Sequence, residues 1–475
     1  MSRVSAWVRR TLAREHPEAA ALGDALAYEV VSVLWSGSIV AMLAWSALGG
    51  RADDVYAWIG MGDAPDASNT AILAIGPESM ALWGIGDSEG ADTPHDLVAE
   101  LVDFARLAGA RTVAVDLLLD RPSEAAGADA RLAEAVGAFG RVVTATRYVG
   151  SETGGPPFAV APLPAIQDQV LPGFANLVSE RARLLDGPDA PTIVRYTYLQ
   201  QKVALTQVGG SWRENAMNAN GKDDASVPMM PSFALAAAWL HRADTRSVPA
   251  AAETLRRALV ACQGSRASCG GMGLPALEPG DLGDAFPIPY RGRAGRDGIP
   301  TVDGAVALQL MAVLREAGTE DAWTLVGESS REARALAGRL VVIGRVDPAG
   351  DRHITPSSPP LVGVADTHGV RIQAQMMEAL LSGRRLRTLD GGWPEWVAAA
   401  VAVLMVWKAR IYMSAVAQAA VVLFGSTGIL AVGVLMYRYA HVSLPLGVPV
   451  GAAVATWSML RLHAWLATQT GQKRG

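Results

Sequence analysis

The chain has 475 residues, of which 50% are hydrophobic and 18% charged, enough for one large domain and additional membrane segments. Its net charge of -5 gives no indication of general nucleic-acid binding. Residues 30–48 and 396–466 are almost free of acidic side chains, whereas the stretch between them has the composition of a soluble protein. The composition therefore indicates a soluble domain framed by two apolar regions.

The first 48 residues predict a membrane anchor. Residues 1–26 contain a short basic amphipathic helix that suits a cytoplasmic membrane surface. Residues 27–48 carry no charge after Glu29 and are about long enough to cross a hydrocarbon core. An uncleaved anchor is favoured over the alternative, a cleaved signal peptide, because the preceding segment is long and mixed in charge. The positive-inside rule then places the amino terminus in the cytoplasm and the chain from Arg51 onward outside.

Residues 51–389 predict an extracytoplasmic α/β domain. Short β-branched runs at 71–75, 111–116 and 141–146 alternate with helical patterns at 93–107 and 129–136. Such alternation is typical of a mostly parallel sheet covered by helices.

The second half of this domain continues with strands and helices. Residues 192–199 and 201–208 alternate polar with apolar side chains, which predicts two strands paired with each other. A strand at 339–344 and a helix at 369–381, capped by Gly383, close the domain. Further helices are predicted at 233–241, 250–261, 302–316 and 330–337.

The only two cysteines, Cys262 and Cys269, lie close together in the predicted outer domain and outside any C-x-x-C spacing. In an exported domain a local disulfide between them is favoured over two free thiols. Two buried apolar cysteines are the alternative.

The carboxyl-terminal region predicts three more membrane helices, at 393–407, 412–436 and 445–466, followed by a cytoplasmic tail at 467–475. With the anchor they make four transmembrane α-helices and leave both termini inside. Gly447 and Gly451 have the small-x-x-x-small spacing that mediates helix packing, either within the chain or with a partner.

Four polar residues are candidates for binding a small ligand. Asp116 and Asp120 lie at and just beyond the end of the second predicted strand, where ligands bind in open α/β sheets. Asp351 and Thr355 lie in the loop between the last strand and helix. For the aspartates the alternative is a strand-end turn or a helix cap.

No catalytic or cofactor motif emerges, so we expect neither an enzyme nor a bound cofactor. The sequence has no nucleophile elbow, H-E-x-x-H or P-loop. The Gly-rich loop at 84–90 has Glu89 where a dinucleotide loop needs its third glycine, which favours a flexible loop. The D-x-H pairs at 351–353 and 366–368 could in principle ligate a metal but lack a fixed scaffold, so we expect no metal.

Several stretches resemble a known family. Residues 338–383 follow the order strand, Gly, Asp, Thr-Pro, Gly-Val, helix and L-L-x-G, and residues 71–84 and 108–116 resemble an opening strand and a G-A-x-x-V-A-x-D strand. This order is similar to that of the second type of CHASE domain, an extracellular sensory module of cyclases and histidine kinases. The family's usual layout is one anchor helix before the domain and three membrane helices after it.

The resemblance implies a multi-pass inner-membrane sensor or receptor subunit with its large domain outside the cytoplasm. Family members usually continue into an output domain, whereas about ten residues follow the last predicted membrane helix here. We therefore expect the chain to pass its signal to a separate effector of the kinase, cyclase or protease class. The expected partners are the lipid bilayer, that effector and a second copy of the chain, with no nucleic acid. A structural or protein-binding subunit of a cell-envelope complex and an exported enzyme are the alternatives.

Overall fold

The computed structural model describes the residues 59, 61, 64, 66–85, 93–149, 158–181, 192–202, 204–206, 229–244, 248–264, 269–275, 277–282, 285–292, 296–317, 323, 330–346, 351–356, 367–388, 400–406, 424–425, 427–428, 431–440, 442–443, 453 and 456–457. The chain divides into two compact units. One unit comprises 61–181 and 191–387, and the other comprises 1–60, 182–190 and 388–475.

A six-stranded, fully parallel sheet forms the centre of the first unit. Its strands, in spatial order, are β13 (Thr301–Asp303), β1 (Thr70–Ile75), β14 (Leu340–Arg345), β2 (Thr112–Asp116), β3 (Val142–Thr146) and β6 (Val170–Phe174). β1 and β3 are buried along their whole length, which is why these strands read as continuous rather than alternating hydrophobic runs. The predicted α/β class with a mostly parallel sheet is therefore confirmed.

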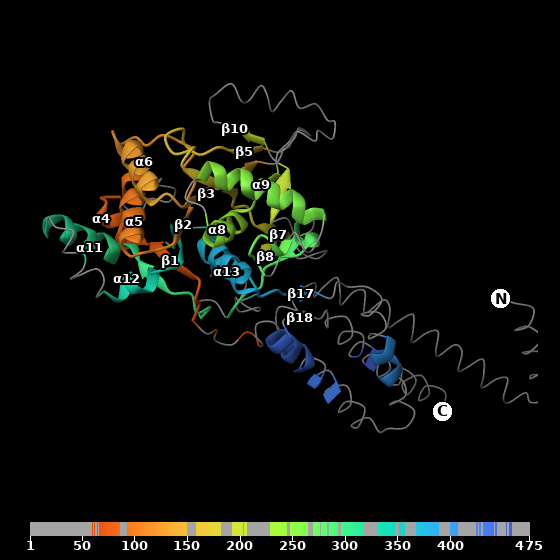
Figure 1. The fold of residues 1–475 in the computed structure, drawn as a ribbon. Coiled ribbons are helices and arrows are strands. Elements are labelled where there is room, and N and C mark those ends of the chain that lie inside the picture. Colours follow the sequence, from red (N-terminus) through yellow and green to blue (C-terminus); the bar gives the residue numbers. More distant parts are fainter. Residues whose placement is uncertain are drawn as a thin grey trace, which may run out of the picture. The chain divides into compact units, whose positions relative to one another are not determined.

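Helices cover both faces of this sheet (Figure 1). On one face lie α5 (His95–Leu107) and α6 (Ala128–Phe139), accompanied by α4 (Pro77–Leu82), α11 (Gly304–Ala317) and α12 (Arg331–Leu336). On the other face lie α8 (Phe233–Arg242) and α13 (Gly369–Ser382). α9 (Val248–Gly264) packs near β6. The predicted strands and helices occur in the predicted order, and the short helix α4 and the two edge strands of the central sheet, β6 and β13, are additions.

The shorter strands form small sheets beside the central one. β4 (Tyr148–Val149), β5 (Phe158–Val160) and β10 (Ala204–Thr206) form one, and β7 (Val178–Arg181), β8 (Thr192–Tyr198) and β12 (Ala285–Pro287) form another. β9 (Gln200–Lys202) pairs with β11 (Met229–Pro231), and β15 (Arg352–His353) pairs with β16 (Thr367–His368). The remaining elements are η1 (Pro279–Leu282), β17 (Arg387–Thr388), the π-helical turn Met436–Ala440 and β18 (Val442–Ser443).

The predicted pairing of residues 192–199 with 201–208 is wrong. β8 pairs with β7 and β12, and the following strands β9 and β10 pair with β11 and β5. Alternation identifies a strand with one buried face, but it does not specify which neighbour supplies the hydrogen bonds.

Buried polar contacts tie α13 to the rest of the domain. The Nη1 atom of Arg291 lies 3.0 Å from Oε1 of Glu378, and Oε2 of Glu378 accepts a 2.9 Å hydrogen bond from the hydroxyl of Thr70 on β1. Arg371 and Gln375 both donate to the buried carboxylate of Asp297, at 2.9 and 3.1 Å. Both ends of the helix are therefore anchored by charge-assisted hydrogen bonds as well as by apolar packing.

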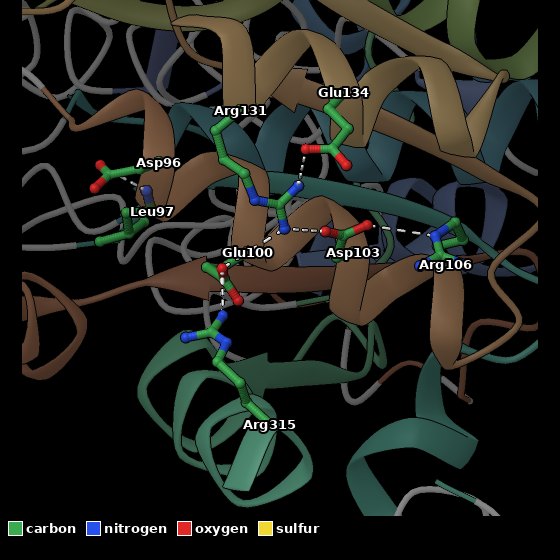
Figure 2. A network of polar contacts seen from close by, with 8 residues as sticks. All are labelled: Asp96, Leu97, Glu100, Asp103, Arg106, Arg131, Glu134 and Arg315. Atoms are coloured by element: carbon green, nitrogen blue, oxygen red, sulfur yellow. Dashed lines mark hydrogen bonds and ion pairs between the residues drawn. The ribbon is translucent and has the colours of Figure 1, made fainter. Parts of the chain in front are cut away.

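A second polar network joins three helices on the opposite face of the sheet (Figure 2). The guanidinium of Arg131 on α6 lies between Glu100 and Asp103 of α5, and its Nη1 lies 3.7 Å from Glu134. Arg315 of α11 reaches Glu100 at 2.5 Å, and Arg106 reaches Asp103 at 3.3 Å. The side chains of Glu100 and Asp103 are each only 10% exposed, so arginines hold these two carboxylates at the helix interface.

Within the described residues, no helix combines the length and apolar character needed to cross a bilayer. The predicted membrane segment 27–48 lies outside those residues, and so do most positions of 393–407, 412–436 and 445–466. In the second unit, Ala402, Val406 and Ala453 form a small buried cluster against which Trp457 packs. Residues from the predicted segments 393–407 and 445–466 therefore contact each other.

Candidate functional site

A cavity of about 930 Å³ lies at the carboxyl-terminal edge of the central sheet. Its walls come from the ends of β2, β3 and β14, from the chain just beyond β6 and from the first turn of α13. In a parallel sheet all strands end at the same edge, and the loops that leave it create a crevice that binds ligands in many α/β proteins. The volume is in the range of small-molecule sites.

Asp116, the last residue of β2, lines this cavity. It is partly buried, and β14 holds Gly344 directly beside it. The pKa of its carboxyl group is raised to about 7, mainly by burial and also by the nearby carboxylate of Asp351, while His353 opposes the shift. Asp116 therefore changes its charge near neutral pH.

Asp120 lines the same cavity from the loop that follows β2. Its side chain is 10% exposed, and its Oδ2 atom lies 3.6 Å from an Nη atom of Arg147, just beyond the end of β3. That oxygen is inaccessible to solvent and accepts no hydrogen bond from the part of the chain that the structure describes. A polar group in this state has unused capacity for a hydrogen bond.

Asp351 lines the cavity beside the amino terminus of α13, and its side chain is 74% exposed. The amide of Gly369 donates a 2.8 Å hydrogen bond to the backbone carbonyl of Asp351, and His353 lies 2.8 Å from Oδ1. A Cβ atom on Gly369 would lie 2.7 Å from Oδ2, so only glycine leaves room for this carboxylate in its present position. The helix terminus also provides a favourable electrostatic environment for the carboxylate.

A second glycine brings α13 close to the sheet. A Cβ atom on Gly344 would lie 2.7 Å from Cγ2 of Val370 and 3.2 Å from Cβ of Asp116. The absence of a side chain in the central strand thus permits the first turn of α13 to approach Asp116 closely.

The structure does not bring Thr355 to the cavity. Its side chain is buried, and its hydroxyl lies 3.2 Å from that of Thr367 in the loop joined by β15 and β16. Three of the four predicted ligand-binding residues therefore lie in one cavity, and the fourth stabilises a neighbouring loop.

The cavity wall includes further residues that were not predicted from the sequence. His95 begins α5 and pairs through Nδ1 with Asp129 at 2.6 Å, and Gln373 lines the cavity from α13. The Thr93-Pro94 helix start was the available signal for His95, because a helix that follows the first strand of a parallel sheet begins near the carboxyl-terminal edge.

The described residues contain no group of three or more His, Cys, Asp or Glu side chains arranged to hold a metal ion. In the first predicted D-x-H pair, Asp351 and His353 contact each other, while Asp366 of the second pair lies outside the described residues. Most of the Gly-rich loop at 84–90 also lies outside them.

The structure joins Cys262 and Cys269 in a disulfide at the carboxyl-terminal end of α9, and both cysteines are fully buried. The bridge closes a short loop between α9 and the segment that leads to η1. Gly447 and Gly451 lie outside the described residues.

Comparison with known proteins identifies one family. The family model for the CHASE2 domain matches residues 30–409, which covers most of the chain and the whole cavity. No curated protein and no solved structure matches the chain. Because the match extends over far more than half of its length, the chain belongs to the CHASE2 family of extracellular sensory domains.

Proposed function

We propose that this protein is a membrane-anchored extracytoplasmic sensor in which a small ligand, bound in the cavity, shifts α13. The single observation that carries the proposal is that α13 contributes Gly369, Val370 and Gln373 to the cavity wall. The same helix ends at Gly383, and ten residues, 383–392, connect that end to the predicted membrane segment 393–407. A ligand at one end of α13 therefore has a short covalent path toward the bilayer.

The packing of α13 supports transmission along its length. Its residues from 372 to 381 are all buried, and its interior polar groups are paired as described above. A helix held in this way moves as a unit rather than bending locally, because packed interiors adopt discrete arrangements. A ligand that binds one arrangement more tightly than another shifts the population toward it.

The output step of the proposal involves the membrane segments and a separate effector. The chain would be a multi-pass inner-membrane protein without enzymatic activity of its own, and its effector would belong to the kinase, cyclase or protease class. Gly447 and Gly451 would form a helix face that packs against the effector's membrane helix or a second copy of the chain.

Co-purification from native membranes tests this proposal. We expect the 475-residue chain to retain a cytoplasmic kinase, cyclase or protease, identified by mass spectrometry. Gly451→Leu should abolish this association, because a bulky side chain separates the helix backbones. Val454→Leu, a change of similar chemistry three residues further along, should preserve it. A partner set confined to the envelope would contradict the sensor and favour a structural subunit.

A further inference from the structure

The cavity is lined by the carboxylates of Asp116, Asp120, Glu124 and Asp351 and by the guanidinium groups of Arg121, Arg147 and Arg345. Arg147 already lies 3.6 Å from Asp120, and His353 lies 2.8 Å from Asp351. The carboxylate of Asp116 has no hydrogen-bond or ion-pair partner among the described side chains, and the charged groups that influence its titration are Asp351 and His353. No described cationic side chain therefore pairs with the carboxylate of Asp116.

A second, independent feature indicates a ligand rather than a solvated acidic surface. The Oδ2 atom of Asp120 is buried in the cavity wall without a hydrogen-bond donor among the described residues. A buried oxygen in this state has unused capacity for a hydrogen bond, which another molecule can supply. A ligand that fills the cavity can donate to Asp120 and to Asp116 at once.

The cavity walls also indicate the chemistry of the uncharged part of such a ligand. Leu117, Leu119 and Val370 contribute apolar surface, so the lining is not polar throughout. A divalent ion such as Ca²⁺ needs six to eight oxygen ligands, and no described cluster offers even three acidic or histidine ligands for a metal ion. An organic cation needs one charged end and an apolar contact, which this arrangement provides.

We propose that the cavity binds a small organic amine, with its protonated amino group held by the carboxylates of Asp116 and Asp351 and its carbon chain against the apolar wall. The inference rests on the sensor function proposed above and specifies the chemistry of the stimulus. The close approach of Asp351 to Gly369 then places the bound charge at the first turn of α13.

Calorimetry with three probes of equal chain length tests the charge requirement. The probes are cadaverine, pentane-1,5-diol and glutarate, titrated at pH 8 into the purified 475-residue chain in an amine-free buffer. We expect cadaverine to bind and each of the other two to bind at least about tenfold more weakly, because only the diamine offers a cation to the carboxylates.

Variants locate the binding group. Asp116→Asn should weaken cadaverine binding at least about tenfold, since it removes the charge without changing the size of the side chain. Gly369→Ala keeps every charge but forces Oδ2 of Asp351 to move, and should also weaken binding. Glu253→Gln, on the exposed surface of α9, is the matched control and should bind as the wild type does. Circular dichroism verifies that each variant is folded.

Each other outcome overturns the inference in a recognisable way. Equal binding of the diol and cadaverine would show a ligand cavity without charge recognition, so the sensor proposal would stand and the amine would be wrong. Undiminished cadaverine binding by Asp116→Asn would place the amine elsewhere. Absence of cadaverine binding would also refute the amine, whereas the co-purification assay judges the sensor function separately.

Discussion

At the scale of single residues, Asp116 is an acid at the end of a strand whose other four residues are buried. A hydrophobic side chain in this place would stabilise the domain more, because burial disfavours the charged carboxylate. An acid retained against this cost is typical of functional sites, where stability is given up for binding.

The first prediction concerns the pH dependence of stability. The pKa of Asp116 rises from 3.8 to about 7 on folding, so between these values the folded state holds a proton that the unfolded state has lost. The stability that Asp116 contributes is therefore fully present below pH 4, falls as the pH rises and is lost above pH 7. At roughly 1.4 kcal/mol per pKa unit, the loss amounts to about 4 kcal/mol.

Asp116→Asn removes this ionisation. The variant should unfold at a higher temperature than the wild type at pH 8, and its advantage should shrink at pH 5. Thermal unfolding followed by circular dichroism at both pH values measures the difference. A difference that does not change with pH would contradict the assigned titration.

A second prediction follows from the close approach of α13 to the sheet. Gly344→Ala would place a methyl group 2.7 Å from Val370, and overpacking of this kind costs about 1–3 kcal/mol. Gly280→Ala, where no atom lies within 4 Å, is the control and should leave the stability almost unchanged. Denaturant unfolding measures the stability of both variants. Equal stabilities would show that α13 shifts away from the added methyl group without a loss of stability.

At the scale of elements, α5, α6 and α11 are joined by the arginine network shown in Figure 2. Arg131→Gln should destabilise the domain by about 2 kcal/mol, less than for a fully buried pair, because Arg131 is 34% exposed and both carboxylates keep another arginine. Glu134→Gln, at a side chain 76% exposed, should cost less than about 0.5 kcal/mol. Chemical denaturation of the two variants provides the comparison, and similar losses would refute the ranking.

The disulfide at the end of α9 provides a fourth prediction. Cys262 and Cys269 are seven positions apart, so the bridge restricts only a short loop and should contribute about 2 kcal/mol. The double variant Cys262→Ala and Cys269→Ala should lower the melting temperature, and reduction of the wild type should lower it equally. Mass spectrometry that finds both thiols free in the exported protein would contradict this prediction.

The sequence predicted those elements whose stability is local and missed the choice of partners. Strands β1, β2, β3 and β14 and helices α5 and α13 all carried clear apolar patterns and end signals. The pairing of β8 with β7 and β12 was missed, because it depends on chain segments far away in sequence. The same difference appears in the site, where strand ends identified Asp116 and Asp120 but only the tertiary structure brings Arg147 and Gln373 beside them.

At the scale of the whole molecule, the charge pattern predicts an arrangement in the membrane. Lys408, Arg410, Lys473 and Arg474 should lie on the cytoplasmic side, and residues 51–389 should lie outside. Reporter fusions at Gly221 and Gly475 should therefore report opposite sides of the membrane. The same side at both positions would exclude the four-crossing arrangement.

The strand order β13-β1-β14-β2-β3-β6 affects how the domain can be made. β14 separates β1 from β2, yet its residues 340–345 are synthesised more than 220 positions after those of β2. Until they emerge, β1 and β2 each have at least one edge without its native partner, and unpaired edges promote aggregation. Chaperones that hold the nascent chain extended, and proteases that remove truncated products, should therefore influence the yield of this protein more than any single contact in its core.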